Sequence, residues 1–296
     1  MPNCIYCGKL AGFLRRYHPE CRAQFERATT TIPVFFEKLL ESTLPADRFE
    51  QLLKEVAGTF HITPDQLRAL SIQGVNAMVQ ASLSQHLMTV EEEDRILEIA
   101  EALGFSIDDI PGLDDRLIKI SMLRDLEDEQ TPNRVKVVGD MPFKLDRDEK
   151  VVWIFNNIKN YRQPKSKEPA APAAPAPLQR EMSSYLSPAS LGERPLDTKG
   201  LIERTGGDLM ITDRNVIGIV SNEHHRKFPL AEIGAFHTYA NGFQIIRKPA
   251  GAGTLNVVVD DPWFAANLIV SLLRASPHAG PTFEATRPEA HSHPEQ

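Results

Sequence analysis

The residues best suited to chemistry are three cysteines and one histidine near the N-terminus. Cys4-Ile-Tyr-Cys7 is followed, after a gap of ten residues, by His18-Pro-Glu-Cys21, and the 296-residue chain contains no other cysteine. Two close pairs of thiolate and imidazole donors are typical of a tetrahedral Cys₃His zinc site. The sequence therefore predicts a structural Zn²⁺ bound by Cys4, Cys7, His18 and Cys21.

A site with four protein ligands is closed, because it leaves no position for a reactive water. A unit of residues 1–28 is too short to build a core, so its metal-binding free energy would be its folding free energy. Two other interpretations are an incidental grouping of these residues and a redox CxxC pair. The redox interpretation lacks the surrounding βαβ pattern that such pairs have.

The residues between the two ligand pairs bear on what this zinc unit does. Arg15, Arg16 and Tyr17 form a basic and aromatic stretch that could contact phosphates or stack on a base. The same stretch could dock a protein, or it could be solvated on a purely structural unit. All three interpretations stay open at the level of sequence.

Composition restricts the class of protein. Lys and Arg total 33 against 40 Asp and Glu, which gives a net charge of −7 and argues against a protein that coats nucleic acid. Three cysteines cannot all form disulfides, so reduced thiols in the cytoplasm are expected. The apolar run at 263–273 is about half the length of a membrane span, and the N-terminus lacks the apolar stretch of a signal peptide. A soluble, cytoplasmic protein is expected.

The segment 30–130 has the pattern of an all-helical domain. Thr63 followed by Pro64 and Gln66, and Thr89 followed by Glu92, are capping boxes that predict two helix starts. A further helix is expected at 113–126. The stretch 91–129 carries 14 acidic and 4 basic residues, which indicates either solvated helix starts or a docking surface for a basic partner.

The pattern then changes to short β-prone runs. The first is 151–155, and a Pro/Ala-rich tract at 163–179 that cannot form a core follows it. Six more strands are predicted, separated by turns such as Asn241-Gly242; they lie at 208–212, 216–220, 227–230, 233–239, 243–247 and 255–259. A helix capped by Asp261 follows, and a tail at 275–296 is expected to be disordered. Strands of this kind suggest a small barrel or bent sandwich with the helix at one end.

The stretch Gly206-Gly-Asp-Leu-Met-Ile-Thr-Asp-Arg-Asn215 resembles the strand and turn of bacterial PH-like (GRAM-related) domains. The segments 239–247, 260–264 and 148–153 fit the same pattern. The resemblance implies a PH-like domain over 148–274, with the Pro/Ala tract as an insertion after its first strand. Residues 60–110 are similar to the helical tellurite-resistance TerB-like fold. The whole layout resembles that of bacterial proteins that combine a zinc unit, a TerB-like domain and a PH-like domain.

The predicted fold class is therefore α+β multidomain: a small zinc-binding unit, an all-α domain, and a PH-like antiparallel β-barrel capped by a C-terminal helix. The sequence has no Gly-rich phosphate loop, GxSxG or HExxH motif, and His224 and His225 are expected at a solvated turn. A non-enzymatic adaptor or regulatory scaffold that binds other proteins is the preferred function. A nucleic-acid-associated regulator that uses the basic zinc unit is the alternative.

Peripheral membrane sensing through the barrel is a second alternative. Lys and Arg in the early strands and turns would attract anionic lipids, but Asp and Glu are interleaved with them. The sequence therefore favours a protein partner over a membrane, and it leaves nucleic acid possible as a partner.

Overall fold

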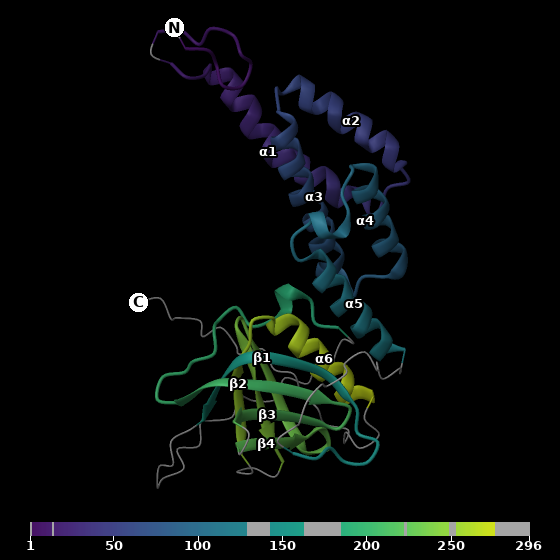
Figure 1. Ribbon diagram of the computed structural model, residues 1–296, viewed down its shortest axis with the longest axis vertical. Helices are drawn as coiled ribbons and strands as arrows, with labels where there is room; N and C mark the ends of the chain where they lie inside the picture. The colour runs from purple at the N-terminus through teal and green to yellow at the C-terminus, as the bar shows by residue number, and fades with distance from the viewer. Residues whose placement is uncertain are drawn as a thin grey trace, which may run out of the picture. The chain divides into compact units, whose positions relative to one another are not determined.

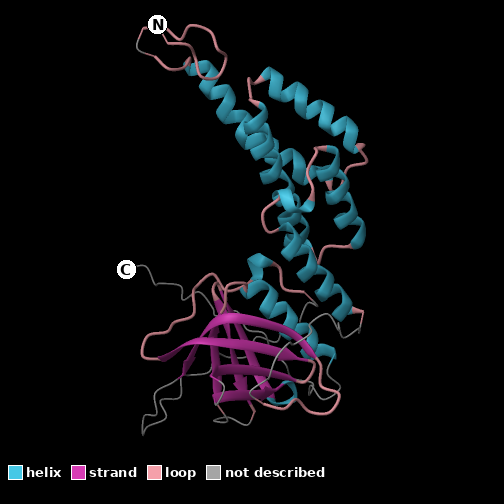
Figure 2. Cartoon of the chain, viewed as in Figure 1, coloured by secondary structure: helices cyan, strands magenta, loops and turns pink. Residues whose placement is uncertain are grey.

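The computed structural model describes residues 2–13, 15–128, 143–162, 185–221, 224–248 and 253–275, with backbone alone at 204–206, 220, 221 and 224. The chain divides into two compact units, 1–120 and 121–296. Mixed helices and an antiparallel sheet, with the Cys/His loops at the N-terminus, agree with the α+β prediction (Figures 1 and 2). The predicted Pro/Ala tract and the C-terminal tail from 276 lie outside the described residues.

The first unit is built from helices. They are α1 (Pro19–Leu39), α2 (Ala46–Thr59), α3 (Pro64–Gln85), α4 (Val90–Ala102) and the start of α5 (Leu113–Glu127), which ends in the second unit; a 3₁₀ turn lies at Ile107–Asp109. Both predicted capping boxes are confirmed. The Thr63 hydroxyl accepts from the Gln66 N–H at the start of α3, and the Thr89 hydroxyl accepts from the Glu92 N–H at the start of α4.

Close packing of α1 on α3 holds this helical unit together. Phe36 of α1 is fully buried and lies edge-on to Phe49 of α2, with ring centroids 4.9 Å apart. A Cβ on Gly74 of α3 would lie 2.3 Å from the Phe36 ring, so the two helices approach through a glycine. Helix α1 runs unbroken from Pro19 to Leu39, and the predicted domain boundary near residue 29 lies inside it.

The described residues of the second unit form seven strands and one long helix that follows them. The strands are β1 (Val151–Arg162), β2 (Ile202–Thr212), β3 (Asn215–Ser221), β4 (His224–Pro229), β5 (Ile233–Tyr239), β6 (Gly242–Arg247) and β7 (Thr254–Val258). Their order in the sheet is β4-β3-β2-β1-β7-β6-β5, and every neighbouring pair is antiparallel. Helix α6 (Pro262–Ala275) follows the last strand.

The sheet is open, which differs from the expected closed barrel. Its edge strands β4 and β5 are not paired among the described residues. The chain leaves β4 through a 3₁₀ turn at Leu230–Glu232, where the Leu230 N–H still bonds to the Arg214 carbonyl beside the start of β3. The sheet nevertheless bends. Strands β3 and β7 are not neighbours in the sheet, yet a Cβ on Gly218 of β3 would lie 3.8 Å from the Leu255 side chain of β7.

Helix α6 supplies much of the core of this unit. Its residues from Trp263 to Leu273 are all buried, including Asn267. The Phe264 ring is fully buried and lies 4.9 Å from the Trp153 ring and 5.8 Å from the Phe155 ring of β1. The expected cap is confirmed, because the Asp261 carboxylate accepts from the Phe264 N–H at 3.0 Å.

The predicted hairpin around Asn241-Gly242 is present with its turn one residue earlier. Tyr239 pairs with Gly242, so Ala240 and Asn241 form the two-residue turn. Gly242 is needed for a different reason: a Cβ there would lie 1.9 Å from the Val257 carbonyl oxygen on β7. The glycine therefore permits close approach of a neighbouring strand.

Candidate metal centre

Two tight loops and the start of α1 position the Cys/His cluster. The Gly8 N–H bonds to the Cys4 carbonyl at 2.9 Å, and Gly8 has a φ of 72°, which glycine adopts without strain. The Cys4 N–H bonds to the Lys9 carbonyl at 2.7 Å. His18 is the residue before α1, so His18 and Cys21 lie at the first turn of this helix.

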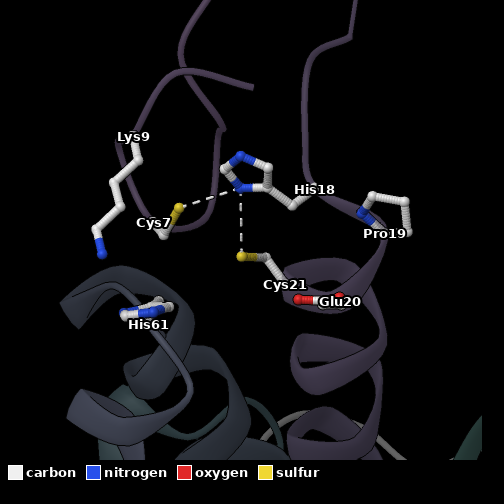
Figure 3. Close-up of a pocket in the computed structure, with 7 residues that line it drawn as sticks. All are labelled: Cys7, Lys9, His18, Pro19, Glu20, Cys21 and His61. Carbon is white, nitrogen blue, oxygen red and sulfur yellow. Dashed lines mark hydrogen bonds between the residues drawn. The ribbon is translucent and has the colours of Figure 1, made fainter. Parts of the chain in front are cut away.

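The four donor atoms converge on one point. The sulfurs of Cys4, Cys7 and Cys21 and a ring nitrogen of His18 all lie within 4.8 Å of one another. Nδ1 of His18 is 3.4 Å from the Cys7 sulfur and 3.6 Å from the Cys21 sulfur, as the dashed lines in Figure 3 show. In a tetrahedral zinc site with ordinary bond lengths, sulfur and nitrogen ligands are about 3.5 Å apart. The cluster is therefore compatible with a metal site.

The second nitrogen of His18 sets the orientation of the ring. Nε2 lies 2.9 Å from the Leu10 carbonyl oxygen. A carbonyl only accepts hydrogen bonds, so Nε2 carries the proton and Nδ1 keeps a free lone pair facing the sulfurs. A metal-binding histidine commonly donates its other N–H to a carbonyl in this way. The sequence contained no sign that Leu10 would provide this oxygen.

The surroundings of the thiols separate their protonation states. Burial acts upward on the pKa of Cys4, but the N–H groups of Cys7, His18 and Tyr6 outweigh it and lower that pKa to about 6. Burial and the hydrogen bond to Cys7 raise the pKa of Cys21 to about 11. The Leu10 carbonyl and the thiols raise the pKa of His18. A divalent cation would replace the protons that these groups share, since metal ligands bind in the deprotonated form.

A pocket of about 350 Å³ opens beside the cluster. Its lining comprises Cys7, Lys9, His18, Pro19, Glu20, Cys21 and His61 (Figure 3). His61 comes from the loop between α2 and α3 and has a φ of 55°, a left-handed conformation that is uncommon outside glycine. Sequence reasoning missed His61, because no motif spacing connects it to a cluster 40 residues earlier.

The three residues predicted to contact a partner differ in their exposure. Arg15 and Arg16 are exposed, whereas Tyr17 is half-buried. The Tyr17 hydroxyl accepts from Arg22 at 3.0 Å, and the Arg22 guanidinium lies over the Tyr17 ring at 5.5 Å. The ring is also edge-on to Tyr6, which in turn packs on Phe25. Tyr17 therefore takes part in packing within the unit.

A buried carboxylate in the second unit was not found by sequence reasoning. The Glu149 side chain is fully buried and accepts from the Thr212 hydroxyl and the Asn215 amide, both at 2.6 Å. Lys227 is 3.3 Å from its other oxygen. Burial alone would raise the pKa of Glu149, but these hydrogen bonds and the lysine charge outweigh it and hold the pKa below its usual range. The network ties the segment before β1 to the β2–β3 turn.

Other candidates from the sequence are not brought to a common site. His224 and His225 begin strand β4 instead of forming a turn, and the His225 ring packs on Phe143 at 4.7 Å. Among the residues that the structure describes, no helix is long and apolar enough to cross a membrane. No family model matches this chain, and no curated protein matches it either.

Proposed function

We propose that Cys4, Cys7, His18 and Cys21 bind a structural Zn²⁺. The observation that carries this proposal is the convergence of three sulfurs and one imidazole nitrogen within 4.8 Å. Three thiolates and one imidazole suit zinc, whereas hard cations such as Mg²⁺ and Ca²⁺ prefer oxygen ligands. The ligand spacing and the Leu10 carbonyl behind His18 give further support.

We also propose that the protein is a non-enzymatic adaptor or regulatory scaffold in the cytoplasm, with other proteins as its partners. A closed four-ligand zinc site leaves no position for a reactive water, so the metal would serve the shape of the N-terminal loops. Under this proposal the zinc unit and the sheet unit each present a contact surface. The resemblance of 148–274 to PH-like domains and of 60–110 to TerB-like helices belongs to the same proposal.

Support for the sheet assignment comes from its arrangement. The seven antiparallel strands bend so that the Arg247 guanidinium of β6 lies 5.8 Å from the centre of the Phe228 ring of β4. The C-terminal helix α6 is buried along most of its length. Binding of nucleic acid through Arg15 and Arg16 is the alternative, and exposure of both side chains favours it. Packing of Tyr17 removes the predicted stacking ring from that alternative. Membrane sensing through the sheet unit, the remaining alternative, has no specific observation in its favour.

Metal analysis and cobalt substitution test the zinc proposal. We expect one equivalent of zinc in protein purified without chelator. Replacement by Co²⁺ should give the intense absorption of tetrahedral thiolate coordination. His18→Ala should lose both, and His61→Ala is the matched control, since His61 lines the pocket without belonging to the cluster. Native protein with far less than one equivalent of zinc would contradict the proposal.

Partner capture tests the adaptor proposal. Zinc-loaded full-length protein and the His18→Ala variant would be compared as baits, with short DNA and RNA tested in parallel. Retention of defined proteins that the variant loses would support a protein adaptor. Tight, salt-dependent nucleic-acid binding that disappears in an Arg15→Ala, Arg16→Ala variant would favour the alternative.

A further inference from the structure

The Cys/His loops, residues 2–18, expose an unusual amount of apolar side chain. Ile5, Leu10 and Phe13 are 65%, 63% and 78% exposed, and they are the three most exposed large hydrophobic residues in the part of the chain that the structure describes. The next is Val90, at 53%. Single exposed hydrophobic residues are ordinary, so we take three within nine consecutive positions as the starting point for an interaction surface.

The backbone of the loops holds these side chains outward. Ile5 donates its N–H to the Arg16 carbonyl at 3.0 Å, and Leu10 is bridged to Asn3 while its carbonyl accepts from His18. These bonds and the Cys/His cluster fix the turns from inside. Within loops 2–18 the buried apolar residues are Cys4 and Ala11, and the side chains of Ile5, Leu10 and Phe13 lie outside this small interior.

The charged residues within loops 2–18 are all positive. Residues 2–18 contain Lys9, Arg15 and Arg16 and no Asp or Glu, although the whole chain has a net charge of −7. All three cationic side chains are on exposed residues. A zinc ion with three thiolates and a neutral imidazole would contribute one negative charge, so the loops keep a positive balance. Their partner should therefore combine apolar material with negative charge.

The residue types separate the possible partners. Nucleic acid offers flat bases that stack on aromatic rings, and Ile5 and Leu10 have none. Cores of protein interfaces are depleted in lysine but enriched in arginine and aromatic residues, so Phe13 and the two arginines would suit a protein partner, whereas Lys9 would not. A lipid bilayer with anionic headgroups accepts protruding aliphatic and phenyl side chains, while Lys and Arg stay at headgroup level and place their charges in water. The combination on these loops fits the third partner best.

We propose that the Cys/His loops bind anionic membrane surfaces by inserting Ile5, Leu10 and Phe13 among the lipids, with Lys9, Arg15 and Arg16 against the headgroups. This inference goes beyond the adaptor function, since it assigns the place at which an adaptor would act. It concerns the loops and not the sheet unit. It rests on the proposed zinc centre only as the brace that keeps the loops folded.

Vesicle co-sedimentation of zinc-loaded, full-length protein tests the proposal. We expect binding to vesicles of phosphatidylcholine and phosphatidylglycerol, and much weaker binding to phosphatidylcholine alone. Phe13→Ser should weaken binding by about tenfold, because a large apolar contact is lost. Replacing both Arg15 and Arg16 by glutamine should weaken binding by about 25-fold, since each cation near an anionic surface contributes about fivefold.

The matched control is Val90→Ser, which removes an exposed apolar side chain on α4 and should leave vesicle binding unchanged. Zinc is measured in every variant, so that a failed zinc centre is distinguished from a failed membrane surface. A Phe13→Trp variant reports insertion directly, because its added fluorescence should shift to the blue and be quenched by brominated lipids. Zinc-loaded protein that does not sediment with anionic vesicles, or equal losses in Phe13→Ser and Val90→Ser, would overturn the proposal. So would binding of the loops to an acidic protein without binding to vesicles.

Discussion

The N-terminal loops and the C-terminal sheet solve the same problem of stability in opposite ways. In loops 2–18 the buried apolar residues are Cys4 and Ala11, whereas α6 alone buries eleven consecutive residues from Trp263 to Leu273. The loops have the donor cluster that a metal needs, and the sheet unit has a continuous apolar interior. Under the zinc proposal, the metal-bound Cys/His residues would stabilise the part of the molecule in which little apolar surface is buried.

The largest expected effect follows from loss of the metal in the N-terminal loops. Removal of zinc by a strong chelator, or Cys7→Ser, should unfold loops 2–18 and the first turn of α1, because a structural zinc site contributes about 10–16 kcal/mol to such a unit. The sheet unit should stay folded. Hydrogen exchange followed by mass spectrometry measures both regions in one experiment. Unchanged protection of loop amides after chelation would show that the loops do not depend on a metal.

The next largest effect is expected from a cavity in the apolar core of the sheet unit. Phe264→Ala should cost the sheet unit about 3–5 kcal/mol, since a fully buried ring packed on Trp153 and Phe155 leaves a cavity. Urea unfolding followed by tryptophan fluorescence measures this, because Trp153 and Trp263 are the chain's two tryptophans. The zinc content should remain that of native protein. Loss of zinc from the Phe264→Ala variant would contradict independent stabilisation of the loops and the sheet unit.

Local spacing explains why the sequence predicted one region better than the other. Cys4, Cys7, His18 and Cys21 lie within 18 residues, and the capping boxes at Thr63 and Thr89 span four residues each, so short patterns contain them. The prediction that these four donors cluster is thus confirmed. The open form of the sheet was not, since it depends on whether two edge strands meet after the chain has folded.

Contacts between distant residues account for the rest. Asn267 interrupts an apolar helix because its amide bonds both backbone groups of Leu186, 81 residues away. Glu149 is buried because Thr212 and Asn215 satisfy it across 63 and 66 residues. His61 reaches the metal-side pocket through the α2–α3 loop. No spacing rule connects such pairs, so these sites emerge from the fold alone.

The buried Glu149 network predicts that the sheet unit is stabilised by a charged group as well as by apolar packing. Its carboxyl has a folded-state pKa below the unfolded value. The stabilisation is therefore complete above the unfolded pKa, about 4.3, and is lost as the pH falls through the folded value. Glu149→Gln should cost about 1.5–3 kcal/mol at pH 7, since hydrogen bonds to a charged acceptor are lost. The gap between native and variant should narrow in acid.

Urea unfolding of the sheet unit at pH 7 and at acidic pH measures this gap. Asp148→Asn is the control, because the Asp148 side chain is 81% exposed. Its stability should follow that of native protein at both pH values. A native-to-variant difference for Glu149→Gln that is the same at both pH values would rule out a role for the charge.

The smallest expected effect concerns the contact between α1 and α3. Beyond its first turn this helix is held by packing, since Gly74 of α3 lies against the Phe36 ring, and Phe36 is backed by Phe49. Gly74→Ala gains about 1 kcal/mol of helix propensity, but the overlap at 2.3 Å should turn this into a net loss of about 1–3 kcal/mol. Gly58→Ala in α2 is the matched control, because its Cβ meets nothing within 4 Å and should stabilise the helix slightly. Circular dichroism during thermal unfolding of both variants, each loaded with zinc, measures the difference. Equal stability of Gly74→Ala and Gly58→Ala would show that the close approach of α1 and α3 at Gly74 does not limit the stability of the helices.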